Sequence, residues 1–251
     1  MAPPVFHLDQ LPGVGSTAVL DGPEGRHAAT VRRLRVGERL LLTDGRGGVA
    51  DAEVTGVGKD RLELEVTARR DVPAPATRVT VVQALPKSER SELAVELATE
   101  AGVDEIVPWA AARCVARWPG PRADKGVLRW RTVAREAAKQ SRRAHVPVVH
   151  DLATTAGLVA LVHTCVQSGG VALLLHESAT VGLRQVGLAA QVLLVVGPEG
   201  GLDDAELAAL TAAGARAVHL GPTVLRTSTA AAVALGALGV LTDRWDSAPP
   251  T

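Results

Sequence analysis

The chain has 251 residues, of which 27 are basic and 27 acidic, so its formal charge is zero. Hydrophobic residues make up 47% and charged residues 22%, which excludes a disordered or fibrous chain. Aromatic residues make up only 2%, which we take to exclude a binding surface built on aromatic stacking, such as that of an RRM sheet.

The cysteines and the N-terminal residues indicate in which cellular compartment the protein works. Cys114 and Cys165 lie far apart and fit neither a CxxC redox pair nor a zinc knuckle, which is typical of a reducing environment. The segment MAPPVFHLDQ has neither the basic nor the apolar region of a signal peptide. The longest stretch without formal charge, residues 152–175, is interrupted by polar and glycine residues and is no membrane span. We therefore expect a cytoplasmic protein.

Up to about residue 70 the sequence predicts a small β-rich domain. The strand patterns are RLLLTDG (39–45), VADAEVTGV (49–57) and RLELEVTAR (61–69), and the last alternates with period two. Gly45, Gly47 and Ala50 match the G-x-G-x-x-G/A pattern of dinucleotide-binding loops, but an alternating strand follows where that motif needs a helix. The segment therefore predicts a hairpin turn.

The stretch DVPAPAT (71–77) predicts a stiff linker between domains at 1–71 and 72–251. After it, strands alternate with helices. Strands are expected at 79–84, 104–107, 147–150, 171–175, 191–196 and 216–220, and helices at 88–101, 124–142, 155–166, 203–213 and from about 228. Six strands interleaved with helices predict an α/β fold with a mainly parallel, doubly wound sheet.

Three loops follow expected strands, and ligands bind beyond the carboxyl ends of strands in open α/β sheets. The loops are His176-Glu177-Ser178, GPEGG (197–201) and GPTVLRTST (221–229). Glycine lets a ligand approach the backbone, whose polar groups can recognise a flat heterocycle. GPEGG lacks the Lys and Ser/Thr of a Walker A loop, and no cluster has metal-ligand spacing. The loops therefore predict a nucleoside cofactor that is not hydrolysed, and no metal.

His176 and Ser178 do not form a nucleophile pair merely because they are neighbours, since a catalytic triad is defined by geometry. A structural hydrogen bond at the strand end is the simpler interpretation of His176.

Basic residues gather in two segments although the net charge is zero. Near the N-terminus, five arginines oppose two glutamates: Arg26, Arg32, Arg33, Arg35 and Arg39 against Glu24 and Glu38. Between residues 113 and 143, ten Lys/Arg oppose Asp124 and Glu136, a net charge of +8. Two separated patches favour a polyanionic partner held in two places, although solvated helix faces remain the alternative.

Five motifs carry a resemblance to a known family. They are HAATVRRLRVGERLLLTDGRG (27–47), QALPKSERSELAVELATEAGVDEIVP (83–108), REAAKQSRR (135–143) with Pro147, LLVVGPEGGLDDAEL (193–207) and HLGPTVLRTSTAAAVALGAL (219–238). In this order they resemble the RsmE family of 16S ribosomal RNA uridine N3-methyltransferases, in the SPOUT superfamily. A lone GPEGG would be weak evidence, whereas five ordered motifs are specific. Ser228 departs from the pattern, because many members carry Glu there.

The resemblance implies an N-terminal PUA-like domain that binds RNA. It also implies a C-terminal SPOUT domain that binds S-adenosyl-L-methionine in a deep trefoil knot, at the interface of a homodimer. The knot rests on resemblance alone, since threaded connections are otherwise very rare. The implied partner is 16S rRNA or the assembled 30S subunit.

The resemblance and the loops together give candidate site residues. The cofactor-binding candidates are Leu175, Gly197, Gly200, Leu220, Gly221, Leu225 and Thr229. The RNA-binding candidates are Arg32, Arg33, Arg35, Arg142 and Arg143.

Methyl transfer from a sulfonium to uracil N3 needs an in-line approach and removal of the N3 proton, from a base that is single-stranded or extruded. Arg226 is our first catalytic candidate, because a fixed guanidinium could stabilise the N3 anion; a salt bridge or helix-entry contact is the alternative. Glu199 is the second catalytic candidate, because its carboxylate could accept the N3 proton or hydrogen-bond the cofactor. The alternative is that it only caps the loop that follows it. The sequence singles out neither as the base.

Two other functions stay open. A SPOUT methyltransferase with another RNA target is one, although LRTSTAAAV does not resemble the Asn-containing motif of the ribose 2′-O-methylating branch. A noncatalytic RNA-binding or ribosome-associated protein on the same fold is the other. Intact cofactor loops argue against it, and S-adenosylmethionine binding would separate the two.

Overall fold

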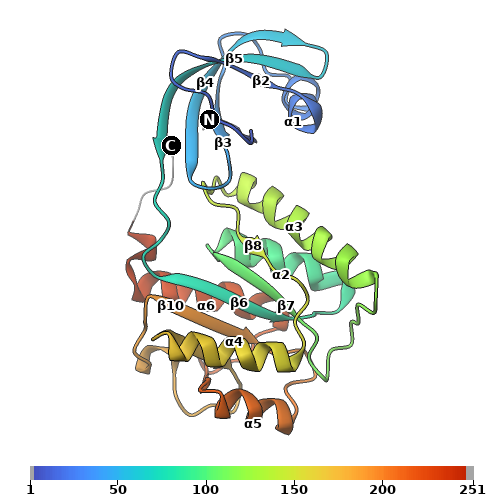
Figure 1. The fold of residues 1–251 in the computed structure, drawn as a ribbon, viewed down its shortest axis with the longest axis vertical. Coiled ribbons are helices and arrows are strands. Elements are labelled where there is room, and N and C mark those ends of the chain that lie inside the picture. Colours follow the sequence, from blue (N-terminus) through green and yellow to red (C-terminus); the bar gives the residue numbers. More distant parts are fainter. Residues whose placement is uncertain (1–2, 247–251) are drawn as a thin grey trace. The chain divides into compact units, whose positions relative to one another are not determined.

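Figure 1 shows the fold in a computed structural model. The structure describes residues 3–246, apart from the side chains of Ser88 and Glu89. The chain divides into two compact units, which are described separately. Unit 1 comprises the residues through Ala74 together with Ala138–Val146, and unit 2 comprises Pro75–Ala137 and Pro147–Ala248.

Unit 1 is built on a five-stranded sheet of order β1–β3–β4–β5–β2 (Figure 1). The strands are β1 (Val5–His7), β2 (Thr17–Leu20), β3 (Arg39–Thr43), β4 (Gly48–Gly58) and β5 (Arg61–Asp71). β1 runs parallel to β3, and the other neighbours are antiparallel. A short helix α1 (Gly22–Arg26) and a π-helical turn η1 (His27–Val31) follow β2.

The alternation along β5 places its apolar side chains in the core of unit 1. Leu62 and Leu64 are fully buried, whereas Glu63 and Glu65 between them are exposed. The predicted hairpin is confirmed, since β3 and β4 pair antiparallel. Its turn contains Gly45 and Gly47 with φ of 70° and 111°, a conformation that favours glycine.

Residues 138–146 join unit 1 through specific contacts. The Lys139 ammonium lies 2.9 Å from a carboxylate oxygen of Glu24, and both side chains are largely buried. The N–H of Gly47 donates to the carbonyl of Ala144, and the N–H of Val146 to that of Gly45. Unit 1 is therefore discontinuous in sequence, whereas we expected a continuous domain at 1–71, because local patterns cannot reveal a segment that returns from far along the chain.

Unit 2 is built on a six-stranded sheet of order β11–β9–β10–β6–β7–β8. The strands are β6 (Arg78–Ala84), β7 (Glu105–Trp109), β8 (Val148–Val149), β9 (Val171–Leu175), β10 (Gln191–Val196) and β11 (Arg216–Val218). Every neighbouring pair is parallel. Near-continuous Val and Leu runs such as VALLL fill the core, as expected for strands buried on both faces.

Helices cover both faces of this sheet. They are α2 (Ser88–Glu100), α3 (Arg122–Gln140), α4 (Thr155–Gln167), α5 (Asp204–Ala212) and α6 (Thr227–Leu241), with short helical turns η2 (Leu183–Gln185) and η3 (Asp243–Trp245). α2 packs on α6 and α4 on α5, and Figure 1 places α4 and α6 on opposite sides of the strands. The predicted doubly wound α/β sheet is confirmed. The trefoil knot stays a prediction.

Candidate active site

A hollow lies at the carboxyl ends of β9, β10 and β11, where ligand sites in open α/β sheets are expected. Its walls come from the three loops that follow these strands, and its empty volume is about 850 Å³, open solvent included. Five of the seven predicted cofactor-binding residues line it: Leu175, Gly197, Leu220, Gly221 and Leu225. The sequence therefore brings together loops that are up to about fifty residues apart.

The other two cofactor candidates lie beside the hollow. A Cβ added at Gly200 would lie 3.2 Å from Cβ and from the carbonyl oxygen of Arg113, so Gly200 packs against that residue. The Thr229 N–H and hydroxyl both donate to the carbonyl of Arg226, at 2.9 and 3.2 Å, and thereby fix the first turn of α6. Gly200 and Thr229 therefore each make a contact that stabilises their own loop or helix.

The chemistry of the walls favours a particular kind of ligand. Val196, Val218 and Ala230 form an apolar floor suited to a flat ring, and Glu177 is the one carboxylate among the described lining residues. None of these lining residues is Lys or Arg, so the hollow lacks the ammonium and guanidinium groups that usually bind a polyphosphate. The hollow thus fits a nucleoside whose charge is neutral or positive.

Gly221 opens one wall. Its φ is 155°, and a Cβ added there would meet no atom within 4 Å. Glycine at this position adopts a conformation that other residues rarely reach and leaves backbone groups open to a ligand.

Two histidines line the hollow and have fixed surroundings. The Nδ1 of His176 accepts the N–H of Ser178 at 3.2 Å, which is the structural hydrogen bond that the sequence suggested. The backbone of His219 pairs with Val181 and Leu183, while its buried Nδ1 has no partner among the described residues. Sequence analysis missed His219, whose only signal was its place at the end of a strand.

Beneath the hollow, Gln83 ties the central strand to α6. This last-but-one residue of β6 is 2% exposed, and its Nε2 donates to the carbonyls of Ala84 and Thr227, at 3.1 and 3.3 Å. Thr227 lines the hollow, and the neighbouring Ser228 is 1% exposed with an unpartnered hydroxyl among the described residues. A small buried residue thus occupies the position where the resembled family often has Glu.

Glu206 forms part of the cap of α5 and also has a second role. The carboxylate of Asp203 accepts the N–H of Glu206 at 2.7 Å, which forms a capping box. The Oε2 of Glu206 accepts the N–H of Asp203 at 3.5 Å. Its Oε1 accepts the N–H of Ala112 and the hydroxyl of Thr155, at 2.8 and 2.9 Å. This buried carboxylate therefore joins the loop after β7 to α4 and α5.

Glu199 and Arg226 stand at the rim. A carboxylate oxygen of Glu199 accepts the N–H of Lys87 at 3.1 Å, and Pro198 beside it lines the hollow. Arg226 is the exposed N-cap residue of α6, between the lining residues Leu225 and Thr227. Its guanidinium has no hydrogen-bond or ion-pair partner in the described part of the chain, so no salt bridge holds it.

The Cys114 thiol lies between charged groups of this region. Burial raises its pKa above the usual value; Arg117 opposes the shift and Glu199 adds to it. The thiol therefore stays protonated and unreactive at neutral pH.

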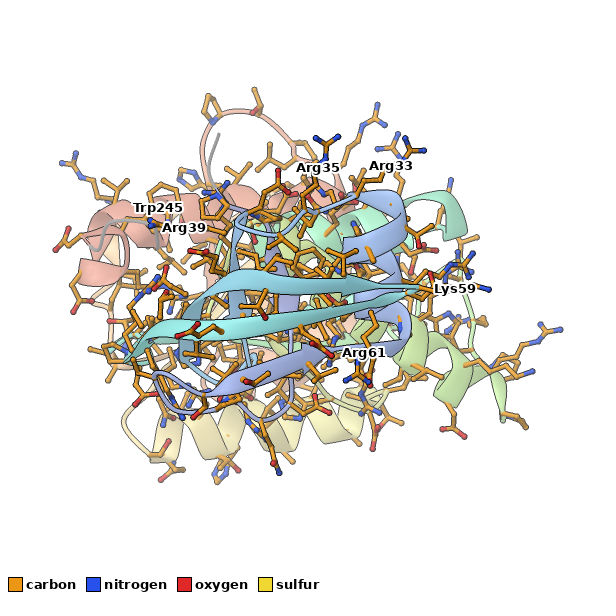
Figure 2. All side chains as sticks on the ribbon, turned by 90° about the horizontal axis from the view of Figure 1, so that it is seen from above. Arg33, Arg35, Arg39, Lys59, Arg61 and Trp245 are labelled. Atoms are coloured by element: carbon orange, nitrogen blue, oxygen red, sulfur yellow. The ribbon has the colours of Figure 1, made fainter. Side chains whose placement is uncertain are left out.

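The RNA-binding candidates lie on unit 1. Arg32, Arg33 and Arg35 are exposed, and Figure 2 shows the side chains of Arg33 and Arg35 extending away from the ribbon. Arg142 and Arg143 are half-buried.

Lys59 and Arg61 lie at the turn between β4 and β5 (Figure 2), outside the basic clusters of the sequence, and Arg61 lies 3.6 Å from a carboxylate oxygen of Glu63. The hydroxyl of Thr30 donates to Asp60 at 2.7 Å, which ties this turn to η1.

Within 3–246, no group of three or more His, Cys, Asp or Glu side chains is arranged to hold a metal ion. No helix in that range is both long and apolar enough to cross a membrane.

Comparisons with known proteins agree with this geometry. Residues 73–239 match an RNA methyltransferase domain, and residues 20–67 match an RNA methyltransferase PUA domain. Fold and site therefore define an RNA methyltransferase of the SPOUT class with a PUA domain.

Relatives of known name specify the family. Ribosomal RNA small subunit methyltransferase E of Mycobacterium tuberculosis is 58% identical over 97% of this chain and 94% of its own length. The Bacillus subtilis protein of the same name is 32% identical over 90% and 91%. A crystal structure of the Neisseria gonorrhoeae enzyme bound to S-adenosyl methionine has a TM-score of 0.86 at 29% identity, over 96% of this chain and 98% of that one. The chain belongs to the ribosomal RNA small subunit methyltransferase E family.

Proposed function

We propose that the protein transfers a methyl group from S-adenosylmethionine to N3 of a specific uridine in 16S ribosomal RNA. One observation carries the proposal for the site: the hollow at the carboxyl ends of β9, β10 and β11 has an apolar floor, a carboxylate and no lysine or arginine among its described lining residues. S-adenosylmethionine supplies a methyl group that is already activated by its positive sulfonium. A ligand of that charge suits these walls, whereas a nucleoside triphosphate does not.

The lining residues divide the work of binding. Val196, Val218 and Ala230 would pack on the adenine, and backbone groups at Gly197 and Gly221 would meet its polar edge. Glu177 would face a positive or hydroxyl-bearing part of the cofactor. Leu175, Leu220 and Leu225 would exclude water from the remaining surface.

Arg226 is the proposed catalytic residue. As a uracil loses its N3 proton, negative charge spreads onto the two carbonyl oxygens, and a planar guanidinium can donate to an oxygen there. The nitrogen lone pair then forms the bond to the methyl carbon as the carbon–sulfur bond breaks. The guanidinium of Arg226, exposed and without a partner within the described residues 3–246, lies beside Leu225 and Thr227, which supports this role.

Glu199 is the proposed proton acceptor. One of its oxygens is engaged by Lys87, which fixes the carboxylate at the rim, and the second oxygen is the one we assign to the N3 proton. Gly200, which packs against Arg113, would then fix the loop after β10. Thr229, which donates to the carbonyl of Arg226, would fix the start of α6.

The RNA partner is proposed to be 16S rRNA, either free or in the assembled 30S subunit. Arg32, Arg33 and Arg35 would hold it, together with Arg142 and Arg143. Since the substrate is ribosomal, we propose that the enzyme works in the cytoplasm.

A homodimer is proposed from the surface of α6. Val233 and Val240 stand on one side of this helix with 46% and 76% of their surface exposed, and Trp245 in η3 is 53% exposed. Val224, in the loop that lines the hollow, is 76% exposed. An apolar strip of this kind favours burial against a second copy. Light scattering should give twice the chain mass of 26.0 kDa, and Val240→Asp should give the chain mass.

Methylation of isolated subunits tests the function. Small subunits from a strain lacking the corresponding gene would be incubated with the purified protein and labelled S-adenosylmethionine, and the RNA would be digested for mass spectrometry. One methyl group on uracil N3 at a single position is expected. A methyl on ribose would instead support the 2′-O branch, and cofactor binding without transfer would support a noncatalytic protein.

A further inference from the structure

A second hollow lies in unit 2, beside the first turns of α2 and the first half of α3. We call it the tryptophan hollow; its principal lining residues are Lys87, Ser91, Arg117, Trp118, Arg129 and Trp130. Its empty volume is about 1200 Å³, open solvent included. The proposed methyl-transfer chemistry uses none of these side chains.

Trp118 forms a preorganised aromatic surface in this hollow. A Cβ added at Gly126 of α3 would lie 2.6 Å from Cδ2 of Trp118, so the indole lies directly on the helix where a side chain is missing. The ring also meets Trp130 edge-on, with centroids 5.3 Å apart and an interplanar angle of 82°. Trp130 is buried, and its Nε1 donates to the Ser91 hydroxyl at 2.9 Å. Trp118 itself is only half-buried, so the supported ring is available to a ligand.

Positive charge surrounds this ring. Two guanidinium nitrogens of Arg117 donate to the carbonyls of Ala111 and Ala112, at 3.1 and 2.6 Å, which fixes the group without neutralising it. Arg129 is paired with Glu92 at 2.6 Å. Neither Lys87 nor Arg117 has a carboxylate partner among the side chains that the structure describes, and the described lining side chains together carry net positive charge.

An aromatic face beside unneutralised cations is the chemistry that binds single-stranded nucleic acid, with the base on the ring and the phosphate on the cations. The low aromatic content of the chain excludes a surface of many stacked rings, but one supported ring suffices for one base.

The hollow adjoins the proposed active site. The N–H of Lys87, which lines the tryptophan hollow, donates to Glu199, and Pro198 beside Glu199 lines the first hollow. One RNA strand can therefore meet both.

We propose that an unpaired nucleotide of the RNA substrate, other than the methylated uridine, stacks on Trp118 in this hollow while Arg117 and Lys87 hold its phosphate. The proposal rests on the proposed function only in taking the RNA to be the methylation substrate.

Replacement of Trp118 tests the stacking. In single-turnover methylation of unmodified small subunits, Trp118→Leu should raise the half-saturating subunit concentration about 5- to 150-fold, as expected for loss of one base stack. Trp118→Phe should raise it less, because a smaller ring remains. S-adenosylmethionine affinity, measured by calorimetry, should stay unchanged, as should the melting temperature of the Phe variant. Leu128→Ala, at an exposed position of the same helix, is the matched control and should behave as wild type.

Two further experiments test the phosphate contact of Arg117 and the position of the RNA at Trp118. Arg117→Gln should reduce the slope of log affinity against log salt by about 0.7, the value for one lost phosphate contact on a single strand. Irradiation of the wild-type protein with an oligonucleotide of the target region carrying 5-iodouridine should give a crosslink on Trp118.

The outcomes separate this proposal from the proposed function. Unchanged half-saturation in Trp118→Leu, or crosslinks confined to other segments, would overturn the tryptophan hollow as an RNA site even if methylation proceeds. Failure of the wild-type protein to methylate any subunit would instead refute the proposed function, while the crosslink would still report whether RNA occupies the hollow.

Discussion

Replacement of Arg244 by Met should cause a large loss of stability without disturbing the proposed cofactor site. The guanidinium lies 2.7 Å from Asp104, the two side chains are 4% and 7% exposed, and the carbonyls of Thr77 and Gly102 accept two further N–H groups of Arg244. Asp104 also accepts the N–H of Val79 at 2.7 Å. Removing the cation leaves a buried carboxylate without its partner, at a cost of about 3–5 kcal/mol.

The corresponding change in melting temperature is about 6–20 °C, since each kcal/mol shifts a domain of this size by about 2–4 °C. Arg78→Met is the matched control, because Arg78 lies 3.2 Å from Glu105 but is about half exposed, and such pairs contribute at most about 1 kcal/mol. Thermal unfolding of both variants measures these changes in melting temperature. A loss in Arg244→Met no larger than that in Arg78→Met would refute the reasoning.

This pair also lies away from the chemistry. Val79 and Asp104 are at the amino ends of β6 and β7, whereas the hollow is at the carboxyl ends of the sheet. Calorimetry below the melting temperature should therefore give the wild-type affinity for S-adenosylmethionine.

Three further outcomes follow from the sites. Gly221→Val should abolish calorimetric binding of S-adenosylmethionine and lower the free energy of unfolding by about 1–3 kcal/mol, because φ of 155° strains a branched residue whose side chain would occupy the opening. Joint replacement of Arg32, Arg33 and Arg35 by Ala should reduce the salt slope of RNA binding by about 2, and an unchanged slope would mark these side chains as merely solvated. Arg226→Lys should lower the single-turnover methylation rate about 10²–10³-fold with little change in cofactor affinity, whereas full activity in Arg226→Ala would eliminate its catalytic role.

The sequence predicts the elements of unit 2 well because their signals are local. The strands at 171–175 and 191–196 have the predicted bounds, since each is an apolar run that fits a strand buried on both faces. Gly102 and Gly214 follow α2 and α5 with φ of 97° and 104°, as glycine after a helix commonly does.

The short elements of unit 1 are absent from the prediction. β1 and β2 have three and four residues, too few to establish a period, and they are strands because β3 and β5 pair with them. The sequence also cannot show the long-range contacts of Glu206. Its capping bond with Asp203 spans three residues and is visible in the sequence, whereas its bonds with Ala112 and Thr155 span 94 and 51 residues.

The GPEGG loop shows where prediction of a site from sequence ends. The position after β10 predicts that the loop lines a pocket at the carboxyl edge of the sheet, and Gly197, Pro198 and Gly201 do line the hollow. Which residues face the site depends on distant partners: Lys87 engages Glu199, and Arg113 packs against Gly200. The packing of Gly200 against Arg113 is one physical reason for a glycine there, and access of a ligand to its backbone, as the sequence predicts, is another. These two roles of glycine look the same in a sequence but have different physical causes.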